Sequence, residues 1–263
     1  MILNMMQMVG LMVVCYLIAL TSLCVYRKLI NNKVANIVFM AVDALFFMAW
    51  TYASYINGWN ESGFLMFDNI SPFIMTIIPL TLFLNEKARE YCNCAIAFLW
   101  FGMLVALVVS PGRTYLGGSV LDASFGHTTE AACHLIASLY GTFLIVSGQV
   151  KCNLQSLKKA CIFIFSAIGI GVVFNYLMHK GNFGMNPYGD FSIYMLEFFD
   201  SFEKTFAAYL LGVLAVLSFG MLSGAGLYRL VCPKDDQDDE EDDDEDEDEA
   251  EYTQDEEETN RLQ

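Results

Sequence analysis

The sequence predicts an all-α polytopic membrane protein with seven transmembrane helices, its N-terminus outside the membrane and a disordered acidic tail inside. Three observations carry this prediction. Hydrophobic residues make up 56% of the 263 residues and charged residues 17%, against about 45–50% and 25% in a soluble domain. The apolar residues form long runs, and 19 of the 30 acidic residues lie between Asp235 and Glu258. We therefore divide the chain into a transmembrane domain, 1–232, and a cytoplasmic tail, 233–263.

A helix that crosses the hydrocarbon core of a bilayer needs about 20 mainly apolar residues. The chain offers seven such segments: 8–26, 35–56, 69–84, 92–110, 131–149, 160–178 and 205–228. The third is the shortest and contains Pro72 and Pro79, which membrane helices tolerate when neighbouring groups satisfy the freed carbonyls. In the last segment the spacing Gly220-x-x-x-Gly224 predicts close packing against another helix.

The fourteen lysines and arginines predict the orientation. Eleven fall in one alternate set of loops, and three, Arg113, Lys180 and Lys204, fall in the other. Short cytoplasmic loops hold Lys and Arg in excess, so we expect the N-terminus outside and the tail in the cytoplasm. Arg27 and Lys28 follow the first segment like an anchor, so no cleaved signal peptide is expected. The chain is expected to be a multi-pass protein of the cell membrane.

The tail is predicted to be disordered. Residues 235–258 contain almost nothing apolar, so they cannot bury enough surface to offset the entropy cost of folding. The tail either keeps a hydrophobic protein dispersed or serves as a cytoplasmic tether for a basic partner or for divalent cations. Nucleic-acid binding is excluded, because it needs clustered Lys and Arg. Cys92-x-Cys94 lacks the second pair that a zinc site needs, so neither a metal nor a cofactor is expected.

Ionisable groups inside the apolar body are candidate functional residues, because each costs roughly 2.5–3.5 kcal/mol at the centre of a spanning helix. Asp43 lies in the second segment, where it either binds a ligand or hydrogen-bonds another helix. His127, Glu130 and His134 follow one stripe of the fifth helix, since residues three and four apart share a face. Glu130 is placed to orient His134 as a general base; a purely structural His134 is the alternative.

Three uncharged polar residues extend this set. Thr76 lies between the two prolines of the third segment, and Asn175 and Asn182 lie at the outer end of the sixth. Under the predicted orientation they fall in the outer half of the bilayer, at the depth of His134. This shared depth predicts a site there.

The chain resembles the YwaF-like integral membrane family, whose animal relatives are seven-helix lipid acyltransferases. The resemblance covers about 68–223 and rests on Asp68-Asn-Ile-Ser-Pro-Phe-Ile-Met-Thr76, Phe98-Leu-Trp-Phe-Gly102, Cys133-His-Leu-Ile136 and Phe174-Asn-Tyr-Leu177, followed by Asn182 and Pro187. It implies that His134 occupies the position of the family's fifth-helix histidine, and that Asn175 and Asn182 match its sixth-helix asparagines. Thr76 stands where the family usually has a cysteine, and Ile74 replaces a histidine.

Two hypotheses of function follow. In the first, the protein is a lipid acyltransferase or acyl hydrolase: Thr76 attacks an ester carbonyl, His134 is the general base, and Asn175 or Asn182 stabilises the oxyanion. Membrane lipids are then the substrates. In the second, the protein is a non-catalytic binding or transport module or a subunit of a membrane complex. Asp43, Glu130 and the asparagines then line a cavity for a polar solute or cation.

Overall fold

The structure is a computed structural model that describes residues 5–56, 70–107, 125–178 and 202–231, all in helices or short connections. The helices are α1 (Met5–Tyr26), α2 (Asn32–Ile56), α3 (Ile70–Leu80), α4 (Glu86–Phe98), α6 (Phe125–Val146), α7 (Leu154–Met178) and α9 (Phe202–Val231), with 3-10 turns η1 (Arg27–Leu29) and η2 (Thr81–Phe83). The prediction of an all-helical fold is confirmed for these residues.

Five helical segments are long and apolar enough to cross a membrane: Gln7–Leu29, Asn32–Tyr52, Thr128–Val146, Leu154–Val173 and Phe206–Val231. A sixth results if Glu86–Phe98 and Trp100–Leu107, which are bent by 45° at the break between them, count as one span. Much of the apolar surface of α1, α2 and α9 is exposed. Helices with apolar outer faces need a lipid environment, so the fold is that of an integral membrane protein.

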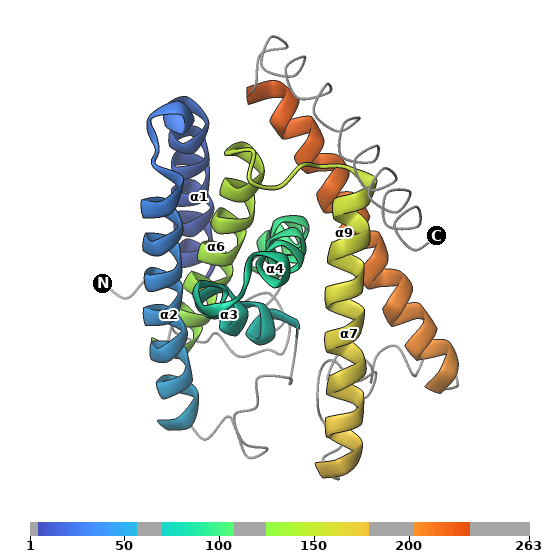
Figure 1. The fold of residues 1–263 in the computed structure, drawn as a ribbon. Coiled ribbons are helices and arrows are strands. Elements are labelled where there is room, and N and C mark those ends of the chain that lie inside the picture. The colour runs from blue at the N-terminus through green and yellow to red at the C-terminus, as the bar shows by residue number, and fades with distance from the viewer. Residues whose placement is uncertain (1–4, 57–69, 108–124, 179–201, 232–263) are drawn as a thin grey trace, which may run out of the picture.

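The third predicted span differs from the others. The described helix α3 has 11 residues, about 16 Å at 1.5 Å per residue, against a hydrocarbon core of about 30 Å. In Figure 1 it lies across the bundle, between α2 and α7, whereas the long helices run up and down the view. Asn85 then caps the next helix by accepting a hydrogen bond from the Ala88 amide at 2.8 Å. The count of seven spans stays a prediction.

Helix α6 lies at the centre of the bundle. It packs against α1, α2, α3, α4 and α9, and its contact with α2 is the most extensive between any two described helices. Side chains from 129 to 146 are almost all buried. A helix that is buried all round has no single apolar stripe, which is why its sequence is mostly apolar on every face, with Glu130, His134 and a few hydroxyl residues as exceptions.

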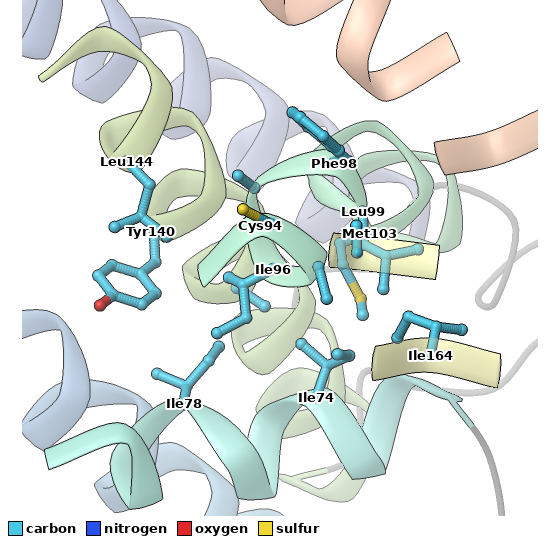
Figure 2. Close-up of a cluster of buried hydrophobic side chains, with 14 of the residues drawn as sticks. Ile74, Ile78, Cys94, Ile96, Phe98, Leu99, Met103, Tyr140, Leu144 and Ile164 are labelled. Carbon is cyan, nitrogen blue, oxygen red and sulfur yellow. The ribbon is translucent and has the colours of Figure 1, made fainter. Parts of the chain in front are cut away.

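Helix α4 fills the space between α6, α7 and α9. Figure 2 shows Ile96 of α4 next to Ile74 and Ile78, which project from α3, and Phe98 on the side of the cluster farther from α3. All four side chains are at most 1% exposed. This apolar cluster holds the short helices α3 and α4 inside the frame of long helices.

Two glycines let the α4 backbone approach its neighbours. A Cβ atom at Gly220 of α9 would lie 1.9 Å from the Phe98 carbonyl oxygen, and one at Gly141 of α6 would lie 2.6 Å from the Ile96 carbonyl oxygen. A Cβ atom at Gly224 would lie 2.8 Å from Ile145. The predicted close packing at Gly220 and Gly224 is thus confirmed.

Basic residues of the connections gather at one end of the bundle. The α1–α2 turn, the α6–α7 connection and the last turn of α9 lie at the same end in Figure 1. They carry Arg27 and Lys28, Lys151, and Arg229, respectively. This grouping is what the predicted orientation requires. The orientation itself, with the N-terminus outside, stays a prediction, and the tail 233–263 lies outside the described residues.

Candidate functional site

Asp43 lies in the middle of α2 and is completely buried, with 0% of its surface exposed. Neither of its carboxylate oxygens has a hydrogen-bond partner in the described part of the chain. Buried carboxylates in proteins are normally paired with a cation or with several hydrogen-bond donors. The alternative predicted for Asp43, a hydrogen bond to another helix, is therefore not what the structure contains.

The face of α6 that meets α2 supplies the surroundings of Asp43. Tyr140 lies on this face, because its ring centroid is 5.4 Å from that of Phe39, which is one helical turn before Asp43 on α2. The Tyr140 hydroxyl is buried and, like the carboxylate, has no hydrogen-bond partner among the described residues. Figure 2 shows the Tyr140 hydroxyl directed away from Cys94 and Ile96. The Asp43 carboxyl group and the Tyr140 hydroxyl thus belong to two helices that pack together, and neither forms a hydrogen bond within the described part of the chain.

Aromatic rings close this region from the side of α2. Phe39 lies one turn before Asp43. The centroid of its ring is 5.4 Å from the ring centroid of Tyr140 and 5.4 Å from that of Phe143. Met40, on the next position, is 4% exposed. The carboxyl group is thus enclosed by apolar and aromatic side chains, where a charge is far less stable than in water.

Arg89 of α4 is engaged by backbone carbonyls. Its Nε donates to the Thr81 carbonyl at 3.1 Å and its Nη2 to the Leu84 carbonyl at 3.0 Å. The Thr81 hydroxyl in turn donates to the Ile78 carbonyl at 2.7 Å. Arg89 therefore closes the end of η2, where helical carbonyls lack partners, and it acts electrostatically on Tyr140.

His134 is buried in α6, 5% exposed, with its Nδ1 2.9 Å from the carbonyl oxygen of Glu130. A carbonyl only accepts, so in the neutral ring Nδ1 carries the proton and Nε2 keeps a lone pair. The residue one turn further on, Ser138, donates to the Trp100 carbonyl at 2.8 Å. The Glu130 carbonyl thus holds one ring nitrogen of His134, and the role predicted for the Glu130 side chain stays a prediction. The side chain of His127 lies outside the described residues.

Thr76 lies on the face of α3 that turns away from the apolar cluster. At about 100° per residue, it is opposite Ile74 and Ile78, and it is half-buried where they are buried. Its hydroxyl donates to the Pro72 carbonyl at 2.8 Å. Within the described residues no hydrogen bond joins Thr76 to His134, since each binds a carbonyl of its own helix.

The positions of the two predicted asparagine side chains are not described by the structure. Asn175 belongs to α7, but its side chain lies outside the described residues, and so does all of Asn182. No group of three or more His, Cys, Asp or Glu side chains in the described segments could hold a metal ion.

Tyr140, Thr81 and Arg89 were not predicted as part of a site. Tyr140 carried a usable signal, because a tyrosine in the middle of a spanning helix needs a partner for its hydroxyl. Arg89 belongs to a predicted cytoplasmic loop, and nothing in its sequence neighbourhood indicates that it would bind the carbonyls of Thr81 and Leu84.

Comparison of the chain with known protein families, with curated proteins and with solved structures yields no match. The resemblance to the YwaF-like family stays a prediction. The fold and the buried polar residues define the class: an integral membrane protein whose described segments are helical and hold a buried carboxyl group with no hydrogen-bond partner among them.

Proposed function

We propose that the protein is a non-catalytic membrane module that binds a small cation inside the helix bundle, with Asp43 as the binding group. If the module is a transporter, this cation is what it carries. One observation carries the proposal: a fully buried carboxyl group with two unpartnered oxygens among the described residues. Ionisable groups inside membrane spans are expensive and mark ion and proton pathways.

The surroundings of Asp43 support a ligand more than a structural role. A structural carboxylate stabilises a bundle by bonding to a neighbouring helix, and here the facing helix α6 offers Tyr140, which is itself unpartnered. A buried hydroxyl without a partner costs about 1–3 kcal/mol. A positively charged ligand at this position would satisfy the carboxylate and offset part of that cost.

Thermal unfolding of the purified full-length protein tests the proposal. Ligand binding to the folded state raises the melting temperature by mass action, so protons or salts of small cations should stabilise the wild type and not Asp43→Asn. Glu86→Gln is the matched control, because Glu86 is an exposed carboxylate in the first turn of α4. Equal responses of the wild type and Asp43→Asn to every cation and to pH would refute the proposal.

The state of His134 favours a second candidate, the predicted lipid acyltransferase or acyl hydrolase. A neutral ring with Nε2 free to accept a proton is the form that a general base needs, and the Nδ1 contact to the Glu130 carbonyl holds it. Catalysis additionally requires the Thr76 hydroxyl to leave the Pro72 carbonyl and reach that nitrogen. Asn175 and Asn182 would then bind the oxyanion.

Lipid turnover by the purified protein in mixed vesicles tests this candidate. His134→Ala and Thr76→Val should each abolish turnover and leave the melting temperature within a few degrees of the wild type. Thr51→Val is a suitable control, since Thr51 also donates its hydroxyl to its own helix but belongs to no predicted site. Full turnover by His134→Ala would eliminate the mechanism.

The tail supports a proposal of its own. With 19 acidic residues between Asp235 and Glu258, it would tether a basic cytoplasmic partner through salt-sensitive attraction. Polylysine should bind the full-length protein at low salt and not a variant lacking 235–263; equal binding by both would leave the tail a solvated segment.

A further inference from the structure

We propose that the acidic run of the tail, residues 235–258, binds the basic end of its own helix bundle. The surface that it covers carries six basic residues, which we call the basic face: Arg27, Lys28, Lys33, Lys151, Lys158 and Arg229. The contact is independent of Asp43 and of the predicted orientation in the membrane, because it joins two parts of one chain at the same end of the bundle.

Three segments that are far apart in the chain converge at this end. Asn36 of α2 donates a hydrogen bond from its Nδ2 to the Oε1 of Gln149, in the α6–α7 connection, at 2.8 Å. The same connection meets the end of α9, since a Cβ atom at Gly224 would lie 3.1 Å from the Sγ of Cys152. The α1–α2 turn, the α6–α7 connection and the last turn of α9 therefore form one surface (Figure 1).

This surface is strongly basic. Its three segments contain the six residues of the basic face and no acidic residue: 27–36, 147–158 and 225–231. Five of the six basic side chains are exposed, and that of Arg27 is half-buried. The next residue, Lys159, is different because it forms an ion pair with Glu90 of α4. The charge of the basic face is thus not balanced by acidic residues of its own segments.

The acidic run begins next to the basic face. Helix α9 ends at Val231, and Asp235 is four residues further along the chain. At no more than about 3.3–3.6 Å per residue, the run starts within about 14 Å of the end of α9 and can itself span about 80 Å. Helix α6 packs against both α1 and α9, so the α1–α2 turn is two interhelical spacings from α9, or about 20 Å. The run can therefore reach the whole basic face.

The charge and the attachment of the tail favour it as the ligand of this face. Its 19 acidic residues between Asp235 and Glu258 repel one another until cations neutralise them. Single exposed ion pairs contribute little, but a tethered segment has an effective concentration in the millimolar range, and many of its charges can bind together.

Anionic lipid headgroups are the competing ligand. Leu29 and Leu230 lie beside basic residues of this face and are 82% and 86% exposed. Large exposed apolar side chains mark surfaces that contact a membrane, so the basic face lies close to lipid. The tail and the headgroups then compete for the same positive charges.

Docking within the chain also affects the proposed tether. A basic partner must displace the basic face from the tail, which weakens its apparent affinity in proportion to the fraction of tails that are free. The tail is thereby held near the bundle until a more strongly basic partner arrives.

Carbodiimide cross-linking of the full-length protein in phosphatidylcholine nanodiscs, followed by mass spectrometry, tests the inference. The reagent joins a carboxylate to a lysine amine in direct contact with it. At low salt, carboxylates of the tail should be joined to Lys33 and Lys158. These cross-links should be lost at about 1 M salt, where the Debye length is about 3 Å.

Neutral variants separate docking from chance collision. Removing two charges of the basic face, in Lys151→Gln/Arg229→Gln, should reduce the cross-links at Lys33 and Lys158 several-fold. Lys204→Gln is the matched control, because it removes an exposed positive charge in the first turn of the same helix α9, and it should leave them unchanged. Equal cross-linking in the double variant and the wild type would overturn the inference.

Two further measurements identify the occupant of the face. When isotope-labelled and unlabelled chains are mixed before reconstitution, the cross-linked peptides should carry the same label; mixed pairs would assign the tail to a second copy and refute docking within the chain. Adding phosphatidylserine should leave the cross-links in place, and their loss would assign the face to lipid headgroups. Binding of polylysine by the full-length protein still tests the tether if docking fails.

Discussion

Tyr16 shows how single side chains join the outer helices to the centre of the bundle. Its hydroxyl lies 3.0 Å from the hydroxyl oxygen of Thr142, and both residues are buried. Thr142 gives its own proton to the Ser138 carbonyl at 2.9 Å, so Tyr16 is the donor of the bond between α1 and α6. This bond is a specific contact within an otherwise apolar interface.

Tyr16→Phe should therefore destabilise the protein by about 1 kcal/mol, the usual net contribution of one hydrogen bond. Thr142→Val should cost a similar amount, and the double variant should cost less than the two together, because the bond is lost only once. Unfolding in denaturant measures these values. Thr21→Val is the control, since its exposed hydroxyl binds the Leu17 carbonyl of its own helix; fully additive losses would contradict the bond.

The reactivity of the Cys152 thiol should depend on pH. It lies in the connection between α6 and α7, where burial raises the pKa of its thiol to about 12, with a smaller contribution from Cys94. The thiolate is the reactive form, so alkylation of Cys152 should be slow at pH 7.5 and accelerate about tenfold per pH unit. Mass spectrometry of maleimide-treated protein follows the reaction.

Lys151→Cys is the matched control for Cys152, because position 151 is the exposed neighbour in the same connection. A thiol there should be alkylated quickly at pH 7.5. If Cys152 reacts as fast as the introduced cysteine, the conclusion that Cys152 is buried in the native protein is wrong.

The candidate site was partly predictable at the residue scale. Asp43, Glu130 and His134 stand out in the sequence because charge is rare in apolar segments. Their surroundings do not, since the contacts of Phe39 with Tyr140, next to Asp43, and of Ser138 with Trp100, next to His134, join residues far apart in the chain. A hydropathy pattern places a residue in a helix but does not say which helix it faces.

At the scale of elements, the packing of α4 depends on glycine at two positions. Gly220 should not tolerate alanine, because a Cβ atom there would meet the Phe98 carbonyl oxygen at 1.9 Å and backbone atoms cannot move aside cheaply. Overpacking typically costs about 1–3 kcal/mol. Gly220→Ala should therefore lower the melting temperature and weaken the contact between α9 and α4.

Gly212 provides the control on the same helix. Nothing lies within 4 Å of a Cβ atom at Gly212, so Gly212→Ala should be neutral or stabilise α9 by up to about 1 kcal/mol through helix propensity. Equal effects of the two substitutions would mean that α9 does not pack on Phe98 as described.

The helices themselves were more predictable than their directions. Long apolar runs gave α1, α2, α6, α7 and α9, because composition and length suffice to identify a span. The short helix α3 and the 45° bend before Trp100 depend on contacts instead. Gly141 and Gly220 admit the carbonyls of the bent region, and no local sequence pattern signals that approach.

At the scale of the whole molecule, the grouping of basic residues predicts which side of the membrane each connection faces. Position 151 lies at the end of the bundle that carries Arg27, Lys28 and Arg229, and cytoplasmic connections are the ones rich in such residues. The segment 108–124 belongs to the opposite set in the predicted arrangement.

Labelling of intact cells tests this orientation. With a membrane-impermeant maleimide, Ser119→Cys should react from outside, and Lys151→Cys should react only after the membrane is opened. The wild-type protein, treated in the same way, corrects for the native thiols. The reverse pattern would invert the topology and move the acidic tail to the outside.

The central position of α6 also has a consequence for biogenesis. Helices α1 and α2 leave the ribosome long before α6, yet both pack against it. On α2, Phe39, one turn before Asp43, packs on the ring of Tyr140 from that later helix. A nascent chain therefore carries an uncovered carboxyl group on α2 while it waits in the insertion machinery. The insertion machinery must therefore retain α2 until α6 has been synthesised, and quality control in the cell must not degrade the chain during that time.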